Sequence, residues 1–108
     1  METNVLQLTD SQFDNVVTQN SLVLVDFWAP WCGPCVRLGP VIEQLATAYK
    51  ERAVVSKLNI DENAIAASKY AIKTIPTILI FHQGLQVERL AGNLSIDQIT
   101  IVLDKYLA

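Results

Sequence analysis

One segment of the chain is apolar at every position except an aspartate: Leu22-Val23-Leu24-Val25-Asp26-Phe27-Trp28. A strand with one face in water alternates apolar and polar residues, so this segment predicts a strand covered on both faces. An amphipathic helix is predicted after it, because apolar residues recur at helical spacing from Leu38 to Tyr49. Pro40 lies inside that helix and is expected to bend it, since proline cannot donate a backbone hydrogen bond.

The rest of the chain alternates between strand-like and helix-like segments. Strands are expected at 5–8, 54–60, 77–81 and 87–90, and helices from 9 onward, at 62–70, and from 95 to the end. Thr9–Gln12 and Ser95–Gln98 have the form of capping boxes. The last two strands, joined by a short turn at His82-Gln83-Gly84, must be antiparallel. The inward-facing residues expected in the first and last helices are Phe13, Val16, Val17, Ile96, Ile99, Leu103, Tyr106 and Leu107.

This β-α-β-α-β-α-β-β-α order predicts an α/β domain with helices on both faces of one central sheet. The 108 residues correspond to one domain, 1–108, and 51% of them are hydrophobic, enough for a core without disulfide scaffolding. The net charge of -3 and the absence of a basic run disfavour nucleic-acid binding. No apolar run approaches the roughly 18 residues of a membrane span. The first residues show no secretory signal pattern, so a reducing compartment is expected.

Both cysteines of the chain, Cys32 and Cys35, lie where the predicted strand passes into the predicted helix. Their spacing at a helix start brings the two sulfurs to one side, within bonding distance. A helix N-terminus carries partial positive charge and unpaired N–H groups, which favour a thiolate and should lower the pKa of Cys32. Pro34 suits a first-turn position. Cys32 is nearer the helix tip and is expected to attack first, with Cys35 resolving the mixed disulfide.

Three other interpretations of the cysteine pair compete with this one. A structural disulfide closing so small a loop would contribute only roughly 2 kcal/mol through chain entropy. A zinc site needs about four ligands, and the only histidine, His82, is distant in sequence, so no metal is expected. Two inert buried thiols are disfavoured by the flanking Trp31, Gly33 and Pro34.

Asp26 is the second informative residue, because a carboxylate in a buried strand is costly unless it is paired or protonated. Desolvation is expected to raise its pKa, and a proton-accepting role toward Cys35 follows. The alternative is a carboxylate at the strand end that reaches water or caps the next turn. Lys57 could equally be an exposed strand lysine. His82 is expected to be a solvated turn residue.

The segment Phe27-Trp28-Ala29-Pro30-Trp31-Cys32-Gly33-Pro34-Cys35 resembles the active site of the thioredoxin family. The resemblance extends along the chain through several further motifs in the family's order: Val25-Asp26-Phe27, Pro40, Lys57-Leu58-Asn59-Ile60-Asp61, Ile75-Pro76-Thr77, Gly84 and Gly92. Several separated motifs are far more specific than the cysteine pair alone. The resemblance implies a thioredoxin fold, with a central mixed five-stranded sheet flanked by helices on both faces.

The resemblance also implies roles for individual residues. It assigns attack to Cys32, resolution to Cys35 and proton acceptance to Asp26. Lys57 would lie near that aspartate and modulate its titration, and Gly33-Pro34 would tune the redox behaviour. A cis peptide bond is implied at Ile75-Pro76, where backbone groups of Ile75 would pair with an extended substrate. The expected substrate surface around Cys32 is formed by Trp31, Ile75, Pro76, Ala91 and Gly92, with Trp28 packed beneath.

Three positions depart from the family's pattern. Val36-Arg37 replaces a more common Lys-Met-like pair, Thr74 stands where glycine is frequent, and Ala91 replaces a common valine. None of these touches the chemistry expected of Cys32, Asp26 and Pro76, so the departures concern the choice of partner rather than the activity.

The function implied by the resemblance is a general protein dithiol–disulfide oxidoreductase that carries electrons, reduces substrate proteins and supports cell redox homeostasis. It would need no bound cofactor. Its partners would be disulfide-containing proteins and a thioredoxin reductase that uses NADPH or ferredoxin, and the chain is expected to be a monomer. The expected location is the cytoplasm, or a reducing organelle such as the plastid stroma if a targeting segment has been removed.

Two other functions remain open from the sequence. A disulfide oxidase or isomerase of an oxidising compartment would use the same cysteine chemistry in the opposite direction, and Pro34 argues against it. A binding module would use a thioredoxin-like surface to hold a partner without turnover. It would keep its activity when both cysteines are replaced by serine.

Overall fold

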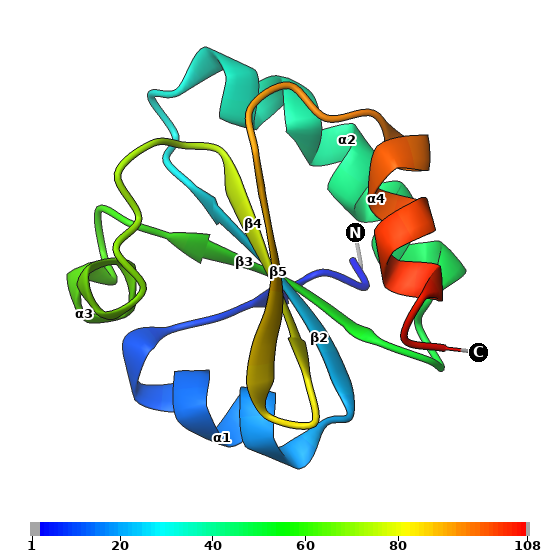
Figure 1. Ribbon diagram of the computed structural model, residues 1–108. Coiled ribbons are helices and arrows are strands. Elements are labelled where there is room, and N and C mark those ends of the chain that lie inside the picture. Colours follow the sequence, from blue (N-terminus) through cyan, green and yellow to red (C-terminus); the bar gives the residue numbers. More distant parts are fainter. Residues whose placement is uncertain (1–2, 108) are drawn as a thin grey trace.

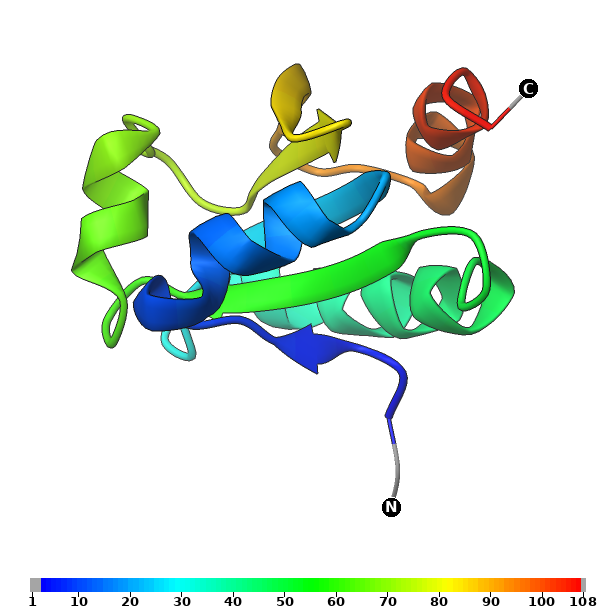
Figure 2. The same ribbon diagram turned by 90° about the horizontal axis from the view of Figure 1, so that it is seen from below.

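Strand β2 (Leu22–Trp28) lies at the centre of a five-stranded sheet in the computed structural model, which describes residues 3–107. The strand order is β1-β3-β2-β4-β5, with β1 at Leu6–Gln7, β3 at Val54–Asn59, β4 at Thr77–His82 and β5 at Leu85–Ala91. Strands β1, β3 and β2 are parallel, whereas β4 is antiparallel to β2 and to β5. Figure 2 shows the strands succeeding one another from β1 to the β4–β5 hairpin. The predicted mixed sheet is confirmed.

Helices cover both faces of this sheet (Figure 1). Helices α1 (Phe13–Gln19) and α3 (Ala64–Lys69) lie on one face, and α2 (Gly33–Ala48) and α4 (Ile96–Asp104) lie on the other. Two apolar cores result, and alternate residues of β2 enter them: Leu22 and Leu24 pack toward α2 and α4, and Val23 and Val25 toward α1 and α3. The prediction of a strand covered on both faces is therefore confirmed.

The alternation along β2 decides where its polar residue points. Asp26 shares the parity of Leu24, so its side chain is directed to the face that α2 covers. In the register of the sheet Asp26 stands opposite Lys57 of β3 and Ile78 of β4. Lys57 has the parity of Val55, which packs in the same core, so Lys57 and Asp26 project from the same face.

The capping box predicted at Thr9–Gln12 is wrong. The segment Asp10–Gln12 forms a short 3-10 turn, Thr9 makes no side-chain cap, and α1 begins at Phe13. Asp10 instead caps α3, because its carboxylate accepts from the backbone N–H groups of Ile65 at 3.1 Å and Ala66 at 2.8 Å. The first N–H groups of α3 have no partner within their own helix. A tertiary hydrogen bond from these groups to Asp10 therefore forms in place of the predicted capping box.

The second capping box is confirmed, since Ser95 and Gln98 exchange both hydrogen bonds at the start of α4. Helix α4 ends at Asp104, however, so Tyr106 and Leu107 follow the helix and pack half-buried against the core instead of belonging to it. The hairpin turn is Gln83–Gly84, with φ values of 55° and 82° as two-residue hairpin turns require.

His82 belongs to β4 and is half-buried, with its ring 5.2 Å from the ring of Tyr106. The prediction of a solvated turn residue is therefore wrong.

Several predicted elements are shorter than expected, including β1, the end of β3 and the start of α3. Helix α2 continues through Pro40, and a bend there stays a prediction. No helix in the described part of the chain is both long enough and apolar enough to cross a membrane.

Candidate active site

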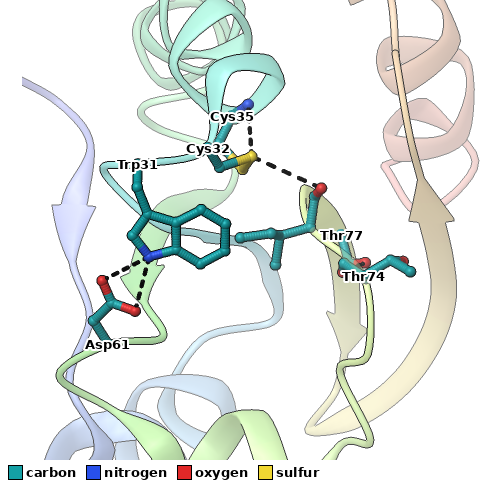
Figure 3. Close-up of a disulfide and its surroundings, with 7 residues drawn as sticks. Trp31, Cys32, Cys35, Asp61, Thr74 and Thr77 are labelled. Carbon is teal, nitrogen blue, oxygen red and sulfur yellow. Dashed lines mark hydrogen bonds between the residues drawn. A yellow bond between two sulfur atoms is a disulfide. The ribbon is translucent and has the colours of Figure 1, made fainter.

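Helix α2 begins directly at the cysteine pair. Cys32 is the N-cap residue, and its sulfur accepts a hydrogen bond from the backbone N–H of Cys35 at 3.2 Å. Pro34 occupies the first turn, where its missing N–H costs nothing. The two cysteines are joined as a disulfide with their Cα atoms 5.2 Å apart, as Figure 3 shows. The local turn of the helix therefore brings the sulfurs together.

The two sulfurs differ in accessibility. Cys32 is 6% exposed and Cys35 is 0% exposed, so an incoming disulfide can reach only the first. The first turn of α2 contains no acidic residue, and its N–H groups favour negative charge on the Cys32 sulfur. This geometry supports the expected order, with Cys32 attacking and Cys35 resolving.

Asp26 is fully buried in the face of the sheet beneath α2. Neither of its carboxylate oxygens has a hydrogen-bond partner among the groups of residues 3–107. Burial raises the pKa of Asp26 from 3.8 to about 7, and the positive charge of Lys57 opposes part of that rise. The alternative of a strand-end carboxylate in water is therefore wrong, and Asp26 can exchange a proton near neutral pH.

Lys57 is half-buried, not a freely exposed strand lysine. Its Nζ lies 4.0 Å from the ring centroid of Trp28, within the range of a cation–π interaction. Trp28 itself packs against the small apolar cluster around Ala29, Cys32 and Cys35. The tryptophan thus lies beneath the cysteines, as predicted, and also holds the lysine beside Asp26.

The loop before β4 borders the disulfide. The Ile75–Pro76 peptide bond is cis, and the carbonyl oxygen of Ile75 lies 3.8 Å from the Cys32 sulfur. Thr77 Oγ1 donates to the carbonyl of Thr74 at 2.6 Å and closes the loop (Figure 3). The backbone N–H of Gly92 donates to the carbonyl of Pro76 at 3.2 Å. The structure therefore brings Ile75, Pro76 and Gly92 to the same end of the sheet as Cys32.

Trp31 is 69% exposed although it is the largest side chain beside the disulfide. Its indole Nε1 donates to both carboxylate oxygens of Asp61, at 3.2 and 3.0 Å, as Figure 3 shows. Asp61 ends the family-like motif Lys57–Asp61, and its contact with Trp31 is an addition to the predicted site. A signal existed, because β2 and β3 are parallel, and the segments that follow them emerge at the same edge.

A model of the thioredoxin family matches residues 4–105. The chain belongs to the thioredoxin family. The thioredoxin of Chlorobaculum thiosulfatiphilum is 45% identical to it, over 94% of this chain and 94% of that protein. Thioredoxin 2 of Chlorobaculum tepidum is 43% identical over 99% of each chain. Among solved structures, a mutant thioredoxin from Halobacterium salinarum is 34% identical and superposes with a TM-score of 0.87, covering 100% of this chain and 96% of its own.

Thioredoxins are protein disulfide oxidoreductases, and this chain has that activity through Cys32 and Cys35. Members of the thioredoxin family carry no cofactor, because the redox-active group is the cysteine pair itself. Their partners are disulfide-containing proteins and a reductase that restores the dithiol. Within residues 3–107, no three His, Cys, Asp or Glu side chains are grouped to hold a metal ion.

Proposed function

We propose that this thioredoxin is a general reductant of protein disulfides. The observation that carries the proposal is the pairing of a reachable Cys32 at a helix N-cap with a fully buried Cys35 one turn further on. Gly33-Pro34 between them supports the reducing direction, because disulfide-forming relatives usually place histidine where Pro34 stands. The protein would then act as an electron carrier in cell redox homeostasis.

The reaction is two successive thiolate exchanges. The Cys32 thiolate attacks one sulfur of the substrate disulfide, so that a mixed disulfide forms and the first substrate thiolate leaves. The Cys35 thiolate then attacks the Cys32 sulfur, the Cys32–Cys35 disulfide forms, and the second substrate thiolate leaves. Two electrons pass to the substrate, and its two thiolates each take up one proton.

Asp26 serves the second exchange in this proposal. Cys35 must lose its proton before it can attack, and it lies where water has no access. A carboxylate with a pKa of about 7, on the face of the sheet that α2 covers, is matched to accept a proton from it near neutral pH. Lys57, held over Trp28, keeps that carboxylate available in its charged form.

Substrates would bind across the surface formed by Trp31, Ile75, Pro76, Ala91 and Gly92. The backbone groups of Ile75 lie beside Cys32, where an extended substrate segment can add to them by strand-like pairing. The exposed ring of Trp31 lies beside the disulfide (Figure 3), and Ile75 packs against the cluster of Ala29, Cys32 and Cys35, so both side chains can supply apolar contact to a substrate. The exposed turn at Gly92 leaves open space for the substrate backbone.

The regenerating partner would be a thioredoxin reductase that draws electrons from NADPH or ferredoxin. We propose that the protein acts as a monomer in a reducing compartment, the cytoplasm or an organelle such as the plastid stroma. A reducing pool is required by the chemistry, because a dithiol that donates electrons must be returned to the reduced state after each turnover.

The reduction potential of the Cys32–Cys35 pair tests the direction of the reaction. The pair is titrated against defined thiol–disulfide buffers, and the fluorescence of Trp28 and Trp31 reports the change. The expected reduction potential is about -270 mV, the value typical of the thioredoxin family. A value near the roughly -180 to -120 mV of oxidising relatives would make the oxidase or isomerase the better assignment.

The variant Cys35→Ser tests turnover. It should accumulate the mixed disulfide at Cys32, visible as an added mass that a reductant removes, whereas Cys32→Ser should form none. If the double serine variant kept full biological activity, the protein would be a binding module instead.

A further inference from the structure

One cation lies against the active-site loop and has no part in the reaction described above. Arg37 stands four positions after Gly33 on the solvent side of α2, and its guanidinium reaches back over that glycine. A Cβ atom built on Gly33 would be 3.3 Å from Arg37 Nη1 and 4.0 Å from Cζ and Nη2. The charge therefore rests against the backbone between the two cysteines.

This guanidinium has no protein partner in the described structure. Among residues 3–107, Arg37 makes no hydrogen bond and no ion pair. The chain's other two arginines are engaged: Arg52 lies over the ring of Tyr49, and Arg89 donates to the backbone carbonyls of Tyr70 and Ala71. Arg37 is the exception, and its fork of N–H donors faces solvent at the edge of the active site.

Helix stability does not explain the placement. A positive charge near a helix N-terminus is unfavourable, because it adds to the positive end of the helix dipole. The first turn of α2 holds no acidic residue that would offset it. Arg37 therefore stands where its charge opposes the dipole of α2 and has no compensating ion-pair partner among residues 3–107.

The other charges around Cys32 are arranged unevenly. Asp61 and Glu62 lie on the Trp31 side and keep their negative charges, because each accepts only from a neutral group, Asp61 from the Trp31 indole and Glu62 from the Asn59 side chain. Lys73 is exposed two residues before Ile75 on the other side. It makes no ion pair among residues 3–107. Arg37 and Lys73 are therefore two exposed cations near the disulfide that no carboxylate among residues 3–107 pairs with.

We propose that Arg37 is a specificity-determining residue that binds a carboxylate of the substrate protein, so that this thioredoxin prefers disulfides flanked by aspartate or glutamate. Guanidinium and carboxylate form paired, charge-assisted hydrogen bonds whose geometry suits recognition at a solvent-exposed edge. The proposal rests on the disulfide-reducing function proposed above.

The test uses three peptides with the same disulfide, in which the residues flanking one cysteine are aspartate, asparagine or lysine. The rate constant for reduction of each peptide by the dithiol protein is measured at low and high ionic strength, for wild type, Arg37→Met and Arg37→Glu. Lys50→Met serves as the matched control, because it removes one exposed positive charge beyond the opposite end of α2.

We expect wild type to reduce the aspartate peptide about two- to five-fold faster than the asparagine peptide at low salt, as a solvent-exposed ion pair allows. Arg37→Met should remove this preference, Arg37→Glu should reverse it in favour of the lysine peptide, and Lys50→Met should leave it intact. High salt should weaken the wild-type preference.

Two results would overturn the inference. Equal loss for all three peptides in Arg37→Met would mean that the arginine acts only through the Cys32 thiolate. Unchanged rates in both Arg37 variants would mean that no substrate carboxylate is bound there. The asparagine peptide separates these outcomes from a failure of the reducing function itself, because its reduction does not depend on the proposed contact.

Discussion

Lys57 stands directly opposite Asp26 in the register of β2 and β3, yet its ammonium lies over the ring of Trp28 and forms no ion pair with the carboxylate. The lysine is close enough to lower the pKa of Asp26 without neutralising it. The carboxylate is thereby left buried, unpaired and able to take up a proton near neutral pH. This arrangement connects a sheet register to the proton chemistry of the cysteine pair.

Asp26→Ala should stabilise the fold at neutral pH. The folded state holds a proton on Asp26 up to about pH 7, whereas the unfolded state releases it near 3.8, so this group's contribution to stability is lost as the pH rises between those values. By pH 7 the loss is on the order of 3–4 kcal/mol. After a cavity cost is allowed for, we expect a net gain of roughly 2 kcal/mol.

Urea unfolding of wild type and Asp26→Ala at pH 5 and pH 8 measures this effect, and the advantage of the variant should grow with pH. Asp26→Asn, which keeps the side-chain volume, should follow the same trend. Asp26→Ala should also slow disulfide reduction roughly 10-fold or more, because Cys35 loses its proton acceptor. If Asp26→Ala had a free energy of unfolding equal to or lower than that of wild type at neutral pH, Asp26 could not be a buried carboxylate with a raised pKa.

Lys57→Met should raise the pKa of Asp26 above its wild-type value of about 7. Methionine keeps the apolar stem over Trp28 but removes the positive charge that opposes the desolvation-driven rise in the pKa of Asp26. The carboxyl carbon shift of Asp26, followed by NMR against pH, reports the change directly. Lys69→Met is the control, because Lys69 pairs with Asp14 on the opposite face of the sheet. A pKa that moves equally in both variants, or falls, would show that Lys57 does not act on Asp26.

Asp61→Ala should weaken substrate reduction without weakening the fold. Trp31 is mostly exposed and is held by the hydrogen bonds from its indole to Asp61, so their loss frees the ring at the substrate surface. We expect kcat/KM to fall about two- to five-fold and the free energy of unfolding to change by less than about 1 kcal/mol. Glu62→Ala, which removes the neighbouring carboxylate, should leave kcat/KM unchanged. Similar losses in both variants would indicate a general effect of charge.

Gly92→Ala should cost both stability and rate. Gly92 has a φ of 90°, a conformation that L side chains rarely adopt, although nothing lies within 4 Å of the added carbon. We expect roughly 1–2 kcal/mol of destabilisation from backbone strain. The matched variant is Gly84→Ala, with a φ of 82° in the distant β4–β5 turn, which should be destabilised similarly and reduce substrates normally. If Gly92→Ala reduced substrates at the wild-type rate, Gly92 would not be part of the substrate surface.

Much of the fold could be predicted because its signals are local. The bounds of β2 follow from its continuous apolar run, and the start of α4 follows from Ser95 and Gln98, which bond to each other within one turn. The cysteine pair could be placed for the same reason, since four residues at a helix start determine which atoms meet. The capping box at Thr9 failed because Asp10 found N–H groups 55 positions away that no local pattern reveals.

The sequence by itself determined the elements, the redox pair and the one carboxylate that had to be buried, since each depends on neighbours within a few residues along the chain. Only the tertiary structure decided that Lys57 rests on Trp28, that Asp61 holds Trp31 and that Arg37 lies over Gly33 without a partner. Those contacts depend on sheet register, on the edge at which parallel strands end and on the direction of a long side chain. Each of these side chains contacts one of several partners that the folded protein brings within reach, and the spacing of residues along the chain does not predict which partner that is.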